Sequence, residues 1–532
     1  MRGALLINPT ITSARTARFP LAVLSLATAL EGRASCQIVD GNVDRNFVAT
    51  ALRSFESGPV DVVGVSVMGG PQLRTAIAVS KAIRERAPTT PIVWGGHFPT
   101  ICPEAALREP YVDYAVRGQG EDTFTELFDA LGREDELERV AHIAGLSWRR
   151  GAGAARGAGA VYGDAVVRGD GVVNRAGAVD DSEIVHNRER PFSKRSLGSR
   201  LPYERLENPR RYLTQTFLGK RTAGYQAALG CRFRCTFCGV ASMFRGRMAL
   251  PTAVRLEQDL RFLGDTLGAD SINFYDHNFF DREVDMVPLL EVLAKLRLPW
   301  WCFARADALI DLSEPSWELV RKSRLRMAYI GAESPSDWLL HDIRKGTRSD
   351  QTLAAVEVCH RHGVIPELSF MLAPPQDPEG ETERTFEFIR HIKRRYPRTE
   401  IMIYVYTPLP PRPGIADAPV ARATKSLRDC AGNTVEFPRT ADEWARPEWI
   451  DYWCHSDAPW VSERLRQRIR DFTTVLGCRF PTATDVRSPP WGRAALRALA
   501  SWRYRFRRYD RPWELRFSRK LIRLWDPRVT GL

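Results

Sequence analysis

Three closely spaced cysteines constrain this chain more than any other feature. The segment LGCRFRCTFCG places Cys231, Cys235 and Cys238 in a C-x3-C-x2-C pattern within one loop. Structural zinc usually takes four ligands in two separated pairs, and no second pair lies nearby in the sequence. An iron–sulfur cubane is normally held by four thiolates, so three would leave one iron open to a small molecule. The pattern favours such a site over the alternatives, a closed zinc site or three unrelated buried thiols.

The cysteine spacing, together with Phe237 and Gly239, resembles the radical S-adenosylmethionine (SAM) enzymes. The resemblance implies a [4Fe-4S] cluster on Cys231, Cys235 and Cys238, with SAM bound to the fourth iron through its amino and carboxylate groups. It also implies that Phe237 lies at the cofactor. Electron transfer would cleave SAM to a 5′-deoxyadenosyl radical, which takes hydrogen from unactivated carbon.

Length and composition indicate a multidomain intracellular protein. A chain of 532 residues with 44% hydrophobic content is too long for one core and predicts two to four domains. The other seven cysteines are single and widely spaced, so no disulfide framework is expected and a cytoplasmic location is predicted. Neither a signal peptide nor an apolar run of membrane-spanning length is recognisable. The net charge of +13 decides nothing by itself.

Residues 1–133 alternate short apolar runs with helical patterns, which predicts an α/β domain with a doubly wound, Rossmann-like parallel sheet. The predicted strands are Ala4–Asn8, Cys36–Asp40, Val60–Val67, Pro91–Gly95 and Asp113–Arg117. The predicted helices are Phe19–Glu31, Phe47–Phe55, Gln72–Arg86, Glu104–Arg108 and Thr123–Leu131. Such a domain binds ligands at the carboxyl ends of its strands, where glycines let the backbone approach a flat ligand closely.

The loops at those strand ends resemble the cobalamin-binding domain that precedes the barrel in one subclass of radical SAM enzymes. The resemblance implies that a corrin and its nucleotide tail contact Ser66, Gly95, Gly96, Pro99, Thr100, Arg117, Gly118, Gly120 and Glu121. The D-x-H-x-x-G signature, whose His ligates cobalt in many cobalamin proteins, is absent. We therefore expect no protein His beneath the cobalt; His97 is the nearest candidate. A domain that packs without any cofactor is the alternative.

Residues 134–220 are predicted to be a linker with an exposed Ala/Gly-rich insertion and a small hairpin at Val161–Val173. Residues 221–416 then carry six further strand–helix units, too few for a closed eight-fold barrel, and match the open partial barrel of the radical SAM family. Strands are predicted at Tyr225–Leu229, Ser271–Tyr275, Trp301–Arg305, Met327–Glu333, Glu367–Ala373 and Glu400–Tyr406. Helices are predicted at Thr252–Gly264, Glu283–Leu296, Glu314–Ser323, Ser349–His362 and Thr382–Arg395.

Charged and aromatic residues follow several of these barrel strands. In the family that the chain resembles, the corresponding Glu333 and nearby basic groups such as Arg305 and Lys345 hold SAM. One carboxylate and one cation suit a zwitterionic ligand, although ordinary salt bridges at the barrel rim would look the same in sequence. Tyr275 and Tyr404 are candidate radical or proton donors, with simple packing as the alternative.

Residues 417–532 are rich in Trp and Arg and are predicted to form a mainly helical region. Four tryptophans between residues 444 and 460 can cover the barrel and line a substrate pocket. From Trp502 to Trp525, aromatic side chains alternate with arginines, a pattern that fits either an anionic membrane surface or a helix packed on the barrel. Packing is favoured because Pro512 divides the segment.

Together these resemblances imply a cobalamin-dependent radical SAM C-methyltransferase acting on a small-molecule or lipid substrate, with flavodoxin or ferredoxin as electron donor. One SAM would methylate cob(I)alamin and a second would supply the radical. An oxidative cyclase or rearrangement enzyme with the same cofactors is the alternative within enzymes. A nucleic-acid-binding protein is not favoured, because the arginines are scattered and no dedicated RNA-binding appendage is visible.

Overall fold

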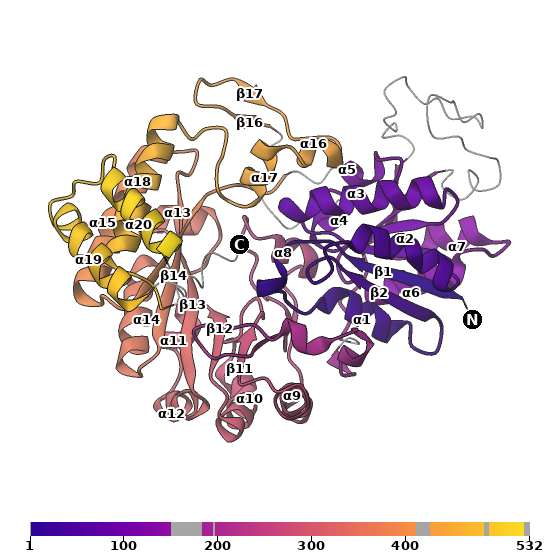
Figure 1. The fold of residues 1–532 in the computed structure, drawn as a ribbon, viewed down its shortest axis with the longest axis horizontal. Coiled ribbons are helices and arrows are strands. Elements are labelled where there is room, and N and C mark those ends of the chain that lie inside the picture. The colour runs from indigo at the N-terminus through magenta and orange to yellow at the C-terminus, as the bar shows by residue number, and fades with distance from the viewer. Residues whose placement is uncertain (1, 151–183, 195–196, 411–425, 484–488, 526–532) are drawn as a thin grey trace.

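The computed structural model describes residues 2–150, 184–194, 197–410, 426–483 and 489–525. An N-terminal α/β domain and an open barrel stand side by side (Figure 1). The helices within residues 441–453 lie against the N-terminal domain, whereas those within residues 463–525 pack on the barrel. The predicted fold class is confirmed.

The N-terminal domain is built on a seven-stranded sheet with the order β2-β1-β3-β4-β5-β6-β7. Its first five strands are parallel, and their order is that of a doubly wound sheet. These strands agree with the predicted ones to within two residues at each end: β1 Gly3–Asn8, β2 Ser35–Asp40, β3 Val62–Ser66, β4 Ile92–Gly95 and β5 Tyr114–Val116.

Helices cover both faces of this sheet. Successive side chains of a strand point to opposite sides and therefore enter two different cores. In β1, Leu5 and Ile7 join the core under α2 and α3, whereas Ala4 and Leu6 join a second core under α1 and α6. The helices are α1 Leu21–Ala29, α2 Phe47–Ser57, α3 Pro71–Arg86, α4 His97–Ile101, α5 Pro103–Leu107, α6 Glu121–Ala130 and α7 Glu136–His142, with a 3-10 turn at Ala14–Thr16.

The segment predicted as a linker contributes two antiparallel strands to this sheet, β6 Leu146–Arg149 and β7 Ile184–His186. The Asn187 side chain stabilises them, since it donates to two carbonyls at the end of α7 and accepts from the Trp148 indole at 3.1 Å. The linker prediction was therefore wrong for these residues. The predicted Ala/Gly-rich insertion and the hairpin at 161–173 lie outside the described residues.

The barrel is an open parallel sheet with the order β15-β14-β13-β12-β11-β8. Its strands are β8 Thr222–Tyr225, β11 Ser271–Phe274, β12 Trp300–Ala304, β13 Leu325–Glu333, β14 Ile365–Leu372 and β15 Glu400–Val405. The helices are α9 Ala253–Arg261, α10 Glu283–Leu296, α11 Ala306–Ile310, α12 Glu314–Ser323, α13 Asp337–Asp342, α14 Ser349–Arg361 and α15 Pro378–Arg395. Six strands are present as predicted, and so are the five predicted helices that connect them.

The first barrel strand differs from its prediction. The strand expected at 225–229 ends at Tyr225, and a separate short strand, β9 Leu229–Gly230, pairs with β10 Met248–Ala249. The break arises because the backbone N–H groups of Ala227 and Ala228 donate to the carboxylate of Asp276 and not to a neighbouring strand. This turn directs the chain away from the sheet and into the cysteine loop.

A small bridging region connects the barrel to the N-terminal domain. It contains β16 Leu427–Arg428, β17 Thr434–Val435, α16 Ala441–Trp444 and α17 Pro447–Trp453. Asp442 forms an ion pair with Lys81 of α3 at 2.8 Å and accepts from the Tyr111 hydroxyl. Trp444 is buried against Phe98 of α4. The tryptophan-rich segment therefore packs against the N-terminal domain as well as following the last barrel strand.

The last three helices of the described residues are α18 Glu463–Arg479, α19 Pro490–Arg505 and α20 Trp513–Trp525. They pack on α15, where the rings of Phe386 and Phe472 stack at 3.7 Å and Arg390 donates to the Tyr504 carbonyl. The segment is broken around Pro512, as predicted. Within the described ranges, no helix has the length and apolar character needed to cross a membrane.

Candidate cofactor and active site

The cysteine loop leaves the barrel at the carboxyl end of its first strand and runs into the short helix α8 Gly239–Phe244. Gly230 opens it with φ +76°, and any side chain there would meet the Arg247 carbonyl. The Thr236 amide donates to the Ile343 carbonyl at 2.9 Å, which ties the loop to the turn before Lys345. Fully buried Asp276 holds the preceding turn from β11. The backbone thus fixes the loop without help from the thiols.

The three thiols are close enough to influence one another electrostatically. Burial raises the pKa of Cys238 to about 11, and the neighbouring Cys235 adds to that effect. Burial likewise raises the pKa of Cys231, while Arg305 and Lys345 act in the opposite direction. No three His, Cys, Asp or Glu side chains in the described residues converge as ligands of a single ion. A cubane binds each thiolate to a different iron, so three neighbouring thiols on one fixed loop fit its donor set.

Glu333, Lys345 and Arg305 meet beside this loop. The buried Lys345 ammonium lies 2.6 Å from Glu333 Oε1, and Arg305 donates to the Lys345 carbonyl at 2.8 Å. Burial opposes the charge on Lys345, but Glu333 and Cys235 outweigh it and raise the lysine pKa. The Arg305 guanidinium also stacks on the ring of Phe233, within the cysteine loop, at 3.5 Å. The structure therefore brings the predicted carboxylate and both cations to the thiols.

The backbone around Glu333 has an unusual conformation and leaves space for its carboxylate. Glu333 has φ +60°, a left-handed conformation that non-glycine residues seldom adopt and that often marks functional sites. A side chain at Gly331 would come within 2.3 Å of Glu333 Oε1. Phe237, the remaining predicted residue here, is half-buried and packs against the main core.

Asn278, on the loop after β11, was missed in the sequence. Its side chain is 1% exposed, and neither its Oδ1 nor its Nδ2 atom has a hydrogen-bond partner within the described residues. The adjacent Phe279 amide donates to the Phe303 carbonyl of β12, two residues before Arg305. Because a buried amide without partners is costly, the position fits a polar group of a bound ligand. Only the surrounding acidic and aromatic run could have indicated it.

A cavity of about 520 Å³ separates the glycine loops of the N-terminal domain from the cysteine-loop side of the barrel. The barrel side contributes Leu229, Val240, Met243, Phe244 and His277. Among the predicted cobalamin contacts, those that line it are Ser66, Gly95, Gly96, Gly118, Gly120 and Glu121. The glycines expose backbone to this largely apolar space, which suits a large flat ligand.

Three predicted cobalamin contacts support this wall without lining the cavity. Pro99 is buried within α4. Thr100 links the two glycine loops, because its hydroxyl donates to the Gly96 carbonyl and accepts from the Gly118 amide at 3.0 Å. Arg117 is 1% exposed and is held by the Asn187 carbonyl and Glu189. Their positions indicate a structural contribution to the cofactor wall.

Two histidines face the same cavity from opposite sides. His97 lies edge-on to Trp453 of α17, and its Nε2 atom fills the space beside Gly239. Burial, with His277 and His455 nearby, lowers the pKa of His97 to about 4. Burial alone lowers the pKa of His277 to about 4, since its exposed surface faces the cavity and not bulk solvent. Both imidazoles are therefore neutral at physiological pH.

The two predicted catalytic tyrosines are not brought together. Tyr275 follows β11 and Tyr404 lies on the edge strand β15, with three strands between them. The Tyr275 ring packs on Gly224 and carries the Arg18 guanidinium at 4.8 Å. The Tyr404 hydroxyl bonds to that of Tyr329 at 3.3 Å. These contacts fit the packing alternative, and the role of either tyrosine as a radical or proton donor stays a prediction.

Comparison with known proteins supports the division into an N-terminal α/β domain and a barrel. The sequence model of the B12 binding domain matches residues 8–128, and that of the Radical SAM superfamily matches residues 225–389. An uncharacterized methyltransferase of Pyrococcus horikoshii is 25% identical over 71% of this chain and 74% of its own length. The anaerobic magnesium-protoporphyrin IX monomethyl ester cyclase of Synechocystis is 23% identical over 61% of this chain and 58% of its own length.

The radical SAM methyltransferase TsrM of Kitasatospora setae, solved with cobalamin and a [4Fe-4S] cluster, has a similar fold. It aligns with a TM-score of 0.57 at 17% identity over 94% of this chain and 99% of TsrM. Fold, site and sequence together define a radical SAM enzyme that carries a B12 binding domain. The chain belongs to the cobalamin-dependent radical SAM enzymes, whose cofactors are cobalamin, a [4Fe-4S] cluster and SAM.

Proposed function

We propose that the protein is a C-methyltransferase that transfers a methyl group to an unactivated carbon of a small apolar molecule or lipid. The cavity between the glycine loops and the cysteine-loop side of the barrel carries this proposal, because its apolar space extends to Val240 and Met243, just after the last cysteine, and would bring a corrin close to the cluster. The Pyrococcus horikoshii methyltransferase shares more of this chain than the Synechocystis cyclase does, which favours methyl transfer over cyclisation.

In this proposal Cys231, Cys235 and Cys238 hold the cluster. Arg305, Glu333, Lys345 and Phe237 position SAM beside them, with Asn278 as an additional polar contact. When bound, the cofactors supply the radical and the methyl group, while the protein orients them and excludes water. Apolar side chains such as Val240, Met243 and Phe244 keep that space dry. A small electron-transfer protein such as flavodoxin or ferredoxin would supply the reducing electrons.

We assign residues 1–133 to the cobalamin-binding domain, 221–416 to the barrel and 417–532 to the C-terminal region. Of the intervening residues 134–220, β6 and β7 belong to the sheet of the first domain. Ser66, Gly95, Gly96, Gly118, Gly120 and Glu121 would contact the corrin and its tail, supported from behind by Pro99, Thr100 and Arg117.

The reaction type is tested with SAM labelled in its methyl group. The reconstituted enzyme is incubated with reductant and a small-molecule and lipid extract of the organism that carries the gene. We expect 5′-deoxyadenosine to form together with a labelled, extractable organic product. Formation of 5′-deoxyadenosine with an altered but unlabelled product would instead identify the cyclase or rearrangement alternative.

We expect cobalamin to bind base-off and without a protein nitrogen beneath the cobalt. The D-x-H-x-x-G signature is absent, and the ring of His97 packs against Trp453 and Gly239. Paramagnetic resonance of the cob(II)alamin form should therefore lack nitrogen superhyperfine splitting, and His97→Ala should leave the spectrum unchanged. His277→Ala, which changes the opposite wall, is the matched control. Splitting that disappears only in His97→Ala would contradict this expectation.

A further inference from the structure

The exposed apolar side chains of this protein are concentrated on its last two described helices. Of the fourteen large hydrophobic residues that are exposed in the described part of the chain, seven lie within residues 491–521. Among these seven, Trp513 is the most exposed at 72%, and Phe506 is 66% exposed. We call this surface the α19–α20 face; it comprises Trp491, Leu499, Trp502, Phe506, Trp513, Phe517 and Leu521.

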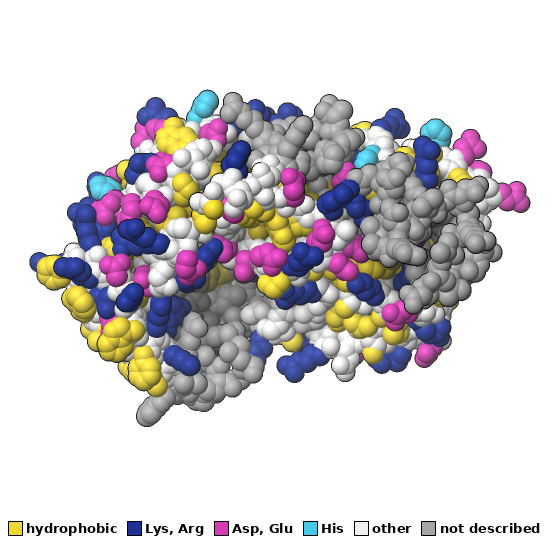
Figure 2. Space-filling view, turned by 90° about the horizontal axis from the view of Figure 1, so that it is seen from above, with side chains coloured by type: hydrophobic (Ala, Val, Ile, Leu, Met, Phe, Trp, Pro, Cys, Tyr) yellow, Lys and Arg dark blue, Asp and Glu magenta, His cyan; other side chains and the backbone are white. Residues whose placement is uncertain are grey.

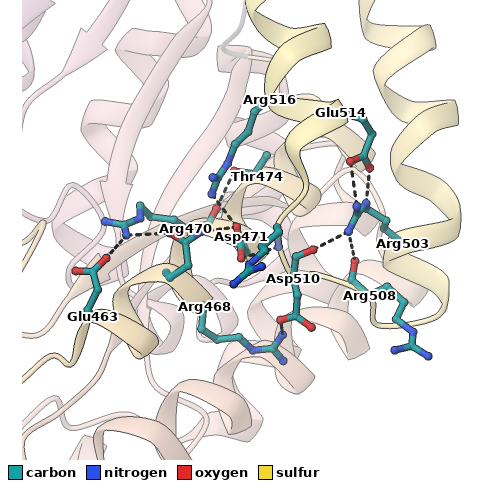
Figure 3. A network of polar contacts seen from close by, with 12 residues as sticks. Glu463, Arg468, Arg470, Asp471, Thr474, Arg503, Arg508, Asp510, Glu514 and Arg516 are labelled. Atoms are coloured by element: carbon teal, nitrogen blue, oxygen red, sulfur yellow. Dashed lines mark hydrogen bonds and ion pairs between the residues drawn. The ribbon is translucent and has the colours of Figure 1, made fainter.

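The α19–α20 face is presented by a firmly packed structure. On their inner sides, Leu496 and Tyr504 of α19 and Leu515 of α20 are buried. Arg503 of α19 forms a two-point ion pair with Glu514 of α20, and Arg516 contacts Asp471 of α18 at 2.7 Å (Figure 3). The buried residues and ion pairs on the inner side thus stabilise the fold of this region, and the exposed aromatic rings do not contribute to it.

The charge around the α19–α20 face is strongly positive. Residues 489–521 contain ten Arg or Lys and two acidic residues. Each acid has a basic partner, since Glu514 pairs with the buried Arg503 and the exposed Asp510 lies 3.5 Å from Arg468. Exposed basic side chains for which the described residues offer no carboxylate are Arg497, Arg505, Arg519 and Lys520. Hydrophobic and basic side chains appear together at the end of the molecule occupied by the C-terminal helices (Figure 2).

We propose that the α19–α20 face docks on an anionic phospholipid bilayer. Trp and Phe rings favour the boundary between headgroups and acyl chains, and Arg side chains can extend past them to lipid phosphates. A second copy of the chain is disfavoured as the occupant, because two such faces would bring like charges together. The apolar rings distinguish this surface from a purely electrostatic one, such as a nucleic-acid-binding patch.

Helix α20, which carries part of this face, also borders the edge strand β15 of the barrel. A second cavity of about 520 Å³ lies between β15 and α18, and both Tyr404 of the edge strand and Arg516 of α20 line it. A membrane-resident substrate is therefore the class that this arrangement favours. That assignment of substrate rests on the proposed methyltransferase function, whereas the docking itself does not.

Vesicle flotation of the full-length protein tests the proposal. The probes are phosphatidylcholine vesicles with and without phosphatidylglycerol, each at low and high salt. We expect binding that requires phosphatidylglycerol and weakens with salt. The variant Trp502→Ser/Phe506→Ser/Trp513→Ser/Phe517→Ser should reduce the bound fraction at least about tenfold. The charge variant Arg505→Glu/Arg519→Glu/Lys520→Glu should also lose binding, and both should keep the wild-type circular dichroism.

The matched control is Leu137→Ser/Val254→Ser/Val284→Ser, which removes side chains at least 50% exposed outside the C-terminal helices and should bind like the wild type. Absence of binding by the wild type, or full binding by the aromatic variant, would overturn the proposal. Self-association that the aromatic variant abolishes, without lipid binding, would assign the face to a second copy. Binding requires no turnover, so a protein that methylates but does not float would refute docking alone.

Discussion

Replacing Cys231, Cys235 and Cys238 together by alanine is expected to remove the iron–sulfur cluster and to abolish cleavage of SAM. The thiolates are the only donors that the loop offers to iron, and the described residues contain no group of three His, Cys, Asp or Glu side chains that could hold a metal in their place. The fold should persist, because Asp276 and the Thr236–Ile343 hydrogen bond hold the loop without the thiols. The measurements are iron and sulfide content, visible absorption and 5′-deoxyadenosine formation after anaerobic reconstitution.

Cys36→Ala/Cys430→Ala is the control for this variant, because the half-buried Cys36 and the exposed Cys430 both lie outside the loop. It should keep the cluster and the cleavage activity of the wild type. Iron and sulfide retained in the triple alanine variant would refute the assignment of these three ligands. Zinc in place of iron and sulfide in the wild-type protein would instead support the closed structural site.

The sequence predicted the parallel strands well because each is a short apolar run bounded by turn residues. It failed where a contact distant in sequence decided the conformation. The expected strand at 225–229 is broken by Asp276, whose carboxylate takes the amides of Ala227 and Ala228. Strands β6 and β7 were missed because each is only three or four residues long and a low-complexity stretch separates them.

In the candidate site, too, the features encoded locally were predictable and those that depend on distant contacts were not. The cysteine loop and the glycine loops are continuous in sequence, and so their residues could be named in advance. The pairing of Glu333 with Lys345 could be proposed only as one of several rim contacts, and its burial became visible in the fold. The packing of Trp453 on His97 and on Gly69 joins segments more than 350 residues apart, which no local pattern encodes.

Replacing Gly120 by leucine is expected to weaken binding in the cavity that we assign to cobalamin. Gly120 lines this cavity with an ordinary negative φ, and a side chain there would first meet Val116 and Leu26 at 3.6 and 3.7 Å. Gly120→Leu therefore fills cofactor space without straining the backbone. Overpacking costs about 1–3 kcal/mol, which predicts a loss of roughly five- to hundredfold in cobalamin affinity. The measurement is a spectroscopic titration of the anaerobic protein with hydroxocobalamin.

The iron–sulfur cluster provides the internal control for this variant. A Cβ atom at Gly120 would meet no residue of the cysteine loop within 4 Å, so iron content should stay at the wild-type value. Gly477→Leu is the matched glycine control, since a side chain at that position of α18 meets nothing within 4 Å. Gly118 would be unsuitable, because its φ of +72° would strain any larger residue. Wild-type cobalamin affinity in Gly120→Leu would show that the corrin binds elsewhere, and the proposed encounter of two cofactors across this cavity would fail with it.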